Sequence, residues 1–179
     1  PKRPKGFEYV DGTWDTGYIV KDSETGNEFV WVPVDGEYLG LERSEFEKSF
    51  TTMASSVDIQ NQEFVKSVNK YGGFFVGRYE SGIGETSGNA VGKPEIKKDK
   101  DVWTGINRAN AKASAESLYS ENLFVKSTLM NSYAYDTLMN WLKTQGYSNK
   151  TYNVDTDSTS WGNYRKAGSV IHKSGSDPN

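Results

Sequence analysis

Residues 61–80 decide the fold of this chain and read NQEFVKSVNKYGGFFVGRYE. Their first half repeats apolar side chains at the three- and four-residue spacing of one helix face: Phe64, Val65, Val68 and Tyr71. The pair Gly72-Gly73 follows at once and is typical of a helix end. Residues 74–80 then continue as an apolar and aromatic strand. The stretch therefore predicts a helix and a strand joined by a two-glycine turn.

Short strands are expected before this unit, over residues 7–10, 18–20 and 28–34. Turn signals separate them, Asp11-Gly12 first and then residues 23–27 with Gly26-Asn27 at the tip. The third of these strands is the strongest, and its apolar run predicts burial on both faces. Pro33 places the end of that strand at a sheet edge or a strand terminus.

Residues 81–100 are expected to form a glycine-rich surface loop after the helix–strand unit of residues 61–80, and two more helices are expected after this loop. The first runs from Thr104, a candidate N-cap, to about Tyr119. The second is capped by Asn131 or Ser132 and ends at Gly146. Its buried face is predicted to hold Tyr135, Leu138, Met139 and Leu142. Three tryptophans in periodic segments are predicted to be core residues: Trp31, Trp103 and Trp141. The fold class is therefore α+β, with residues 1–6 as an extended linker and residues 7–179 as a single domain.

Composition excludes several classes of function. The 179 residues include 21 basic and 24 acidic side chains, and the net charge of −3 lacks the basic excess of a nucleic-acid binder. The chain has no cysteine, which excludes disulfides, thiolate metal sites and cysteine nucleophiles within it. No apolar run approaches the roughly 18 residues of a membrane span, so membrane insertion is not expected.

Several segments together resemble a known family. Residues 29–34 (FVWVPV) and 70–82 (KYGGFFVGRYESG), with Ser127-Thr128-Leu129 and Tyr135-Asp136 later in order, are similar to formylglycine-generating-enzyme-like (sulfatase-modifying factor) domains. The nearest branch is that of Firmicutes surface proteins and prophage structural genes. Over about residues 5–170, the resemblance implies a C-type-lectin-like fold with mixed sheets, helices and long loops.

The chain departs from that family in two ways. The family continues into an Asn-Val-Trp-Glu-Trp-like strand and an Arg-Gly-Gly motif, and neither occurs here. The resemblance therefore implies the N-terminal two-thirds of a domain that lacks its C-terminal strands. The enzymes of the family use a copper-binding cysteine pair, which this sequence also lacks. We therefore expect no catalytic activity, unless an absent C-terminal segment completes a formylglycine-generating-type oxidase.

Two sets of charged residues are candidate sites. Arg78 and Glu80 alternate on the predicted strand and are expected on one face, where they either bind a polar ligand or form a structural ion pair. Asp155 and Asp157, in an Asp-x-Asp pattern that is common by chance, are candidate ligands for calcium, and no other cofactor is expected. His172, the sole histidine, is expected to be an exposed surface residue.

Three aromatic residues lie in the polar segment 148–169: Tyr152, Trp161 and Tyr164. Rings among polar neighbours suit stacking on sugars or contact with a protein, and they equally suit pinning a long loop to the domain. We expect a non-catalytic recognition module, extracellular on a phage virion or bacterial cell surface, that binds a host-cell glycan or surface protein. The alternative is a structural fibre, decoration or tail protein, with a second chain completing its sheet or as a homo-oligomer.

Overall fold

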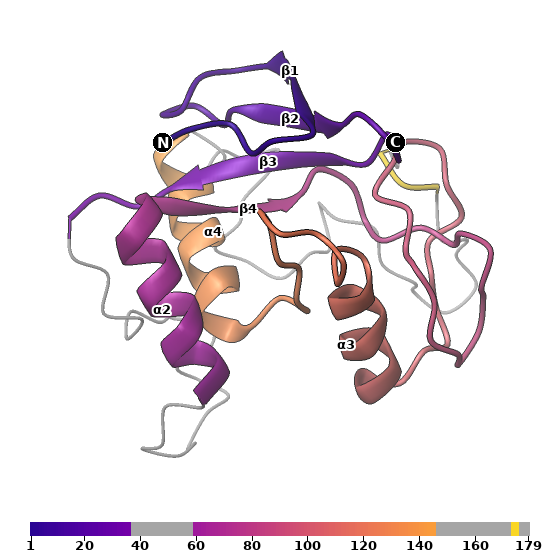
Figure 1. Ribbon diagram of the computed structural model, residues 1–179. Helices are drawn as coiled ribbons and strands as arrows, with labels where there is room; N and C mark the ends of the chain where they lie inside the picture. Colours follow the sequence, from indigo (N-terminus) through magenta and orange to yellow (C-terminus); the bar gives the residue numbers. More distant parts are fainter. Residues whose placement is uncertain (37–58, 146–172, 176–179) are drawn as a thin grey trace.

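The computed structural model describes residues 1–36, 59–145 and 173–175. Its centre is a four-stranded antiparallel sheet in the order β1-β2-β3-β4 (Figure 1). The strands are β1 (Phe7–Asp11), β2 (Ile19–Asp22), β3 (Glu28–Pro33) and β4 (Gly73–Gly77). The helices are α2 (Ile59–Tyr71), α3 (Arg108–Ser117) and α4 (Ser132–Thr144). The α+β prediction is confirmed, and all strand pairs of this sheet are antiparallel rather than mixed.

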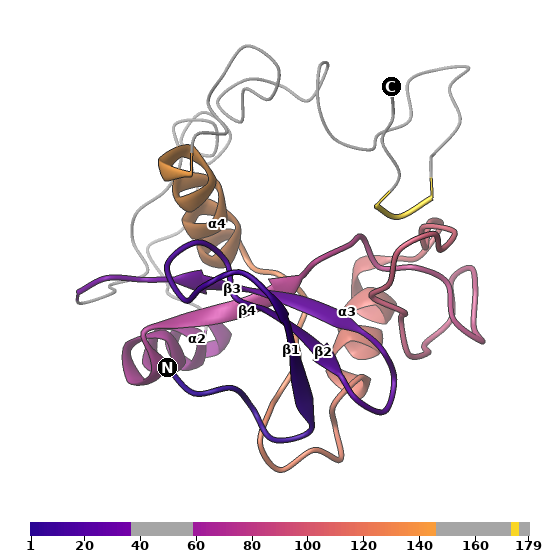
Figure 2. The same cartoon turned by 90° about the horizontal axis from the view of Figure 1, so that it is seen from above.

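The first three strands form a meander whose turns are those predicted. Gly12 has φ +77° after β1, and Gly26 has φ +77° between β2 and β3. Both conformations are left-handed and cost glycine nothing. A bulge between Tyr9 and Asp11 shifts the register of β1 on β2. Seen from above in Figure 2, β1 and β2 cross over β3 and β4, which reflects the twist of the sheet.

The core lies where β3 pairs with β4. Trp31 faces Phe75 across the ladder, and Val32 faces Phe74. Trp31 is 4 % exposed and Val32 is fully buried, whereas the other four residues of β3 are partly exposed. The predicted burial on both faces therefore holds at Trp31 and Val32, adjacent residues whose side chains point to opposite faces, and is incomplete along the rest of the strand. The strand does end at Pro33, as expected.

The helix–glycine–glycine–strand unit is present, and α2 packs on β4 through the rings of Phe64 and Phe74, whose centroids are 5.0 Å apart. Val68 is buried. Tyr71, the last of the four apolar residues assigned to one helix face, is 55 % exposed. It is the last residue of α2, and its ring lies beside the Lys70 ammonium group, 4.9 Å away, rather than on the sheet.

The other two helices begin at asparagines. Asn107 caps α3, because its side-chain oxygen accepts a hydrogen bond from the backbone N–H of Asn110 at 2.9 Å. The prediction of a helix starting at Thr104 is wrong, since Gly105 has φ +72° and interrupts any helix there. Asn131 caps α4 in the same way, as predicted.

The buried side of α4 differs from the prediction. Of the four residues expected there, only Met139 is buried, and its buried companions are Tyr133, Ala134 and Asp136. Trp141, which was also predicted to be a core residue, is only partly exposed and lies against Gly17. The core predictions for Trp31 and Trp103 are confirmed. Within the described ranges, no helix has both the length and the apolar character needed to cross a membrane.

The two glycines that end α2 should respond differently to a methyl group. In Gly72→Ala the new methyl meets open space and only the left-handed φ of +76° is penalised, which costs about 1 kcal/mol. In Gly73→Ala it meets the Val32 carbonyl and the Trp31 ring as well, so we expect a loss of about 3 kcal/mol. Urea unfolding of both variants measures this difference, and equal losses would contradict the packing described.

Candidate functional site

Most of the predicted site residues lie outside the described residues. These are the three loop aromatics Tyr152, Trp161 and Tyr164, the calcium candidates Asp155 and Asp157, and His172. Their proposed roles stay predictions. Only Arg78 and Glu80 can be placed, and within the described residues no group of three potential metal ligands occurs.

Arg78 and Glu80 bind different partners. The strand was predicted to reach residue 80, but β4 ends at Gly77, so the alternation argument does not apply to them. The Arg78 guanidinium pairs with the Glu28 carboxylate of β3 at 2.6 Å, and the backbone N–H of Arg78 donates to the Glu28 carbonyl at 3.0 Å. The Glu80 carboxylate accepts a hydrogen bond from the Gly175 N–H at 3.4 Å. The structural ion pair is therefore the arrangement observed for Arg78.

A row of aromatic rings extends from the core to the surface at the β1–β2 loop. Phe75 and Trp31 lie at its buried end, with ring centroids 5.0 Å apart. Trp14 makes an edge contact with Trp31 at 5.4 Å and stacks flat on Tyr18 at 4.0 Å. Tyr9 closes the row 5.0 Å from Tyr18 and is 49 % exposed. Sequence reasoning missed this row, because its members come from three strands and a loop.

The loop that carries the row also supplies polar groups. The Tyr9 hydroxyl donates to the Gly12 carbonyl at 3.2 Å, which fixes the ring. The hydroxyls of Thr13 and Thr16 are exposed and lie 2.8 Å apart in a hydrogen bond to each other. The side-chain oxygen of Asp11 accepts from the Gly12 N–H. An ordered, partly exposed ring beside fixed hydroxyls is the kind of surface on which a sugar ring can stack and hydrogen-bond.

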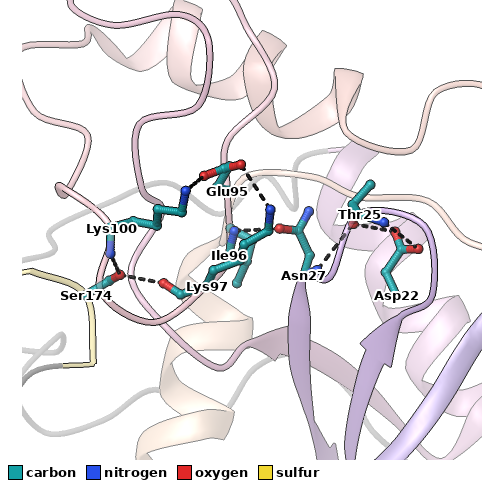
Figure 3. Close-up of polar contacts among 8 residues, drawn as sticks. All are labelled: Asp22, Thr25, Asn27, Glu95, Ile96, Lys97, Lys100 and Ser174. Carbon is teal, nitrogen blue, oxygen red and sulfur yellow. Dashed lines mark hydrogen bonds and ion pairs between the residues drawn. The ribbon is translucent and has the colours of Figure 1, made fainter.

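A second polar cluster joins the β2–β3 turn to residues 95–101 (Figure 3). Asn27 is 2 % exposed, and its side-chain oxygen accepts the Ile96 N–H at 2.8 Å. Glu95 forms ion pairs with Lys97, at 3.0 Å, and with Lys100. Hydrogen bonds from Lys100 and then Lys97 hold the pKa of Glu95 below its ordinary value. We call residues 95–101 with Asn27 the junction.

The buried Asp22 and the half-buried Tyr119 form an acid–phenol pair beside the junction. The Tyr119 hydroxyl donates to Asp22 Oδ2 at 2.9 Å, and Thr25 donates to the same oxygen at 2.8 Å. Burial raises the pKa of Tyr119, and the Asp22 carboxylate raises it further. Burial alone would raise the pKa of Asp22, but the hydrogen bonds from Glu24, Thr25 and Tyr119 outweigh it and lower that pKa.

This pair is suited to structure rather than to proton transfer. The phenol keeps its proton at physiological pH and uses it to bind Asp22. The carboxylate already accepts hydrogen bonds on both oxygens. A general acid or base needs a pKa near the working pH and a free position for the substrate, and neither residue has them. The Asp22–Tyr119 pair therefore serves to link the end of β2 to the residues that follow α3.

Removing the buried Asp22 carboxylate should destabilise the protein, because the β2–β3 turn and the half-buried Tyr119 hydroxyl lose their shared hydrogen-bond acceptor. We expect Asp22→Ala to lower the free energy of unfolding by about 3 kcal/mol at neutral pH. The exposed neighbour Glu24 is the matched control, and Glu24→Ala should change stability by less than about 0.5 kcal/mol. Urea unfolding followed by far-UV circular dichroism measures both values.

The same carboxylate gives a dependence on pH. The pKa of Asp22 is lower in the folded chain than its ordinary value of 3.8. The contribution of Asp22 to the free energy of unfolding is therefore complete above pH 3.8 and is lost as pH falls through the folded pKa. The stability gap between wild type and Asp22→Asn should therefore be constant near neutral pH and narrow below about pH 4. A gap that persists undiminished into strong acid would contradict this role.

Asp136 differs from Asp22 because its buried carboxylate lacks hydrogen-bond partners among the described residues. It lies on α4, is fully buried, and neither carboxylate oxygen has a hydrogen-bond partner among the described residues. A buried polar group without a partner costs free energy. We expect Asp136→Leu, which keeps the branching and the number of heavy atoms of the side chain, to raise the free energy of unfolding by about 1–3 kcal/mol. Asp22→Leu in the same assay should lower it, and loss of stability in both variants would show that Asp136 is satisfied in solution.

The fold and the site rest on the geometry of the chain itself. No family model matches the sequence, and neither a curated protein nor a solved structure is significantly similar to it.

Proposed function

We propose that this chain is a non-catalytic recognition module that binds a host-cell glycan. In this proposal it is a C-type-lectin-like relative of the formylglycine-generating-enzyme-like domains, displayed on a phage virion or a bacterial surface. The observation that carries the proposal is the aromatic row from Phe75 to Tyr9, which ends in a half-exposed ring. Glycan-binding sites use such rings because the apolar face of a sugar stacks on them at little cost in conformational entropy.

The row is suited to a ligand because it is already ordered. Tyr9 is held by its hydroxyl and by contact with Tyr18. Tyr18 in turn stacks on Trp14, which contacts the buried Trp31. A ligand therefore meets a rigid surface, and little binding free energy is lost in ordering side chains. In this proposal the predicted loop aromatics Tyr152, Trp161 and Tyr164 supply further stacking contacts.

The test compares two exposed tyrosines. Tyr9 is 49 % exposed at the row, and Tyr71 is 55 % exposed at the end of α2. We expect Tyr9→Ser to weaken binding to immobilised bacterial cell-wall glycan by about tenfold, the value of one aromatic stacking contact. Tyr71→Ser should bind as wild type does.

The controls separate the proposal from its alternatives. Both variants must first show the thermal midpoint of the wild type within a few degrees. Equal binding by wild type and both variants would show that Tyr9 does not contact the glycan. If only the double variant Trp161→Ala, Tyr164→Ala lost binding, the glycan site would lie at Trp161 and Tyr164 instead. Binding to a protein-retaining envelope but not to the purified glycan would identify a protein receptor instead.

A structural role is the second candidate, because the sheet has open edges. Within the described residues, no strand pairs with the outer edge of β1 or of β4. The bulge in β1 discourages pairing there, since bulges twist an edge away from a straight partner strand. The β4 edge, Gly73–Gly77, is therefore the favoured place for a second chain. Light scattering of the purified chain distinguishes this role, because it requires an oligomer and the recognition module does not.

A further inference from the structure

Residues 173–175 are bound by the junction as a ligand would be. Ser174 is fully buried. Its backbone N–H donates to the Lys100 carbonyl at 2.8 Å, and its carbonyl accepts the Asp99 N–H at 2.8 Å. Its hydroxyl donates to the Lys97 carbonyl at 2.5 Å and accepts the Lys100 N–H at 3.0 Å. Figure 3 shows the hydroxyl between these two groups. Every polar group of Ser174 is thus matched by the 97–100 backbone.

Gly175 is recognised by shape. Its φ of +67° is left-handed, and a Cβ placed on it would lie 2.6 Å from the Tyr79 ring. Its N–H faces the Glu80 carboxylate at 3.4 Å. Any other residue would be strained in this conformation and would collide with the ring. The contact therefore selects a serine followed by a glycine.

The groups that bind Ser174-Gly175 are held in place by other contacts. Gly82 bridges to Glu95 and to Val102, and the Ile83 N–H donates to the Asp101 carbonyl at 2.8 Å. The Asn27 side chain accepts a hydrogen bond from the Ile96 N–H, and Glu95 forms ion pairs with Lys97 and Lys100. None of these interactions involves residues 173–175. The segments on either side of the backbone that receives Ser174 are therefore held by contacts other than those to Ser174.

The backbone conformation of Asp99 is further evidence that residues 97–101 form a binding site. It is the only non-glycine residue with positive φ among the described residues, at φ 61°. Such conformations cost free energy and collect where the backbone must present a group to a ligand. Here the strained residue directs its N–H to the Ser174 carbonyl.

We propose that residues 79–80 and 97–101 form a recognition slot for peptides that contain a Ser-Gly turn. The chain fills this slot with its own Ser174-Gly175. A peptide of the same chemistry supplied from outside competes with that segment for the same hydrogen bonds. This inference concerns a surface separate from the aromatic row and does not depend on glycan binding.

The experiment uses the full chain and a synthetic peptide of sequence HKSGSD, which corresponds to residues 172–177. Gly175→Val removes the internal competitor and leaves every slot residue unchanged. We expect the labelled peptide to bind this variant at least about tenfold more tightly than wild type, because wild type must first release its own segment. Fluorescence anisotropy measures both affinities.

A second peptide, HKSASD, is the matched control for specificity. Its alanine takes the place of the glycine that fits against Tyr79, and it should bind the variant at least about tenfold more weakly. If Gly175→Val does not give the circular dichroism spectrum of the wild type, Ser174→Ala replaces it, because it removes only the hydroxyl contacts. Equal affinity for the two peptides, or no binding to either variant, would overturn the proposal.

Discussion

The contact between Trp31 and Gly73 is the constraint on which the rest of the structure depends. A methyl group on Gly73 would overlap both the Trp31 ring and the Val32 carbonyl, so β3 and β4 approach this closely only because residue 73 is glycine. The same glycine begins β4 two residues after α2 ends at Tyr71, so this short connection holds the helix close to the strand. On its other side Trp31 contacts Trp14 and Phe75, so the aromatic row starts from this contact too.

Local patterns made part of this fold predictable. The two-glycine helix end, the turns at Gly12 and Gly26 and the cap at Asn131 each depend on residues close in sequence, and each is present. The errors arose where tertiary contacts set the outcome. The alternation expected for Arg78 and Glu80 does not apply because β4 stops at Gly77, although β3 continues to Glu28 and the Arg78 N–H still donates to the Glu28 carbonyl.

The clusters with possible function could not be predicted for the same reason. Tyr119 reaches Asp22 across 97 residues, and Ser174 reaches Lys97 across 77. No periodic pattern links positions so far apart. The exposed end of the aromatic row gave only a weak signal, since Trp14 stands in a polar turn between Thr13 and Asp15. A large ring among turn residues is a cue that sequence reasoning can use in other chains.

The proposed recognition role depends on the exposed end of the aromatic row and not on the Asp22–Tyr119 pair. The Asp22–Tyr119 pair is occupied by its own hydrogen bonds, whereas the row ends in a ring that solvent reaches. The direct measurement is a nuclear magnetic resonance titration of the chain with soluble cell-wall glycan fragments. The account predicts that the ring signals of Tyr9, Tyr18 and Trp14 shift together with a single affinity while those of Tyr71 do not move. Saturable binding with no shift at these three rings would contradict it.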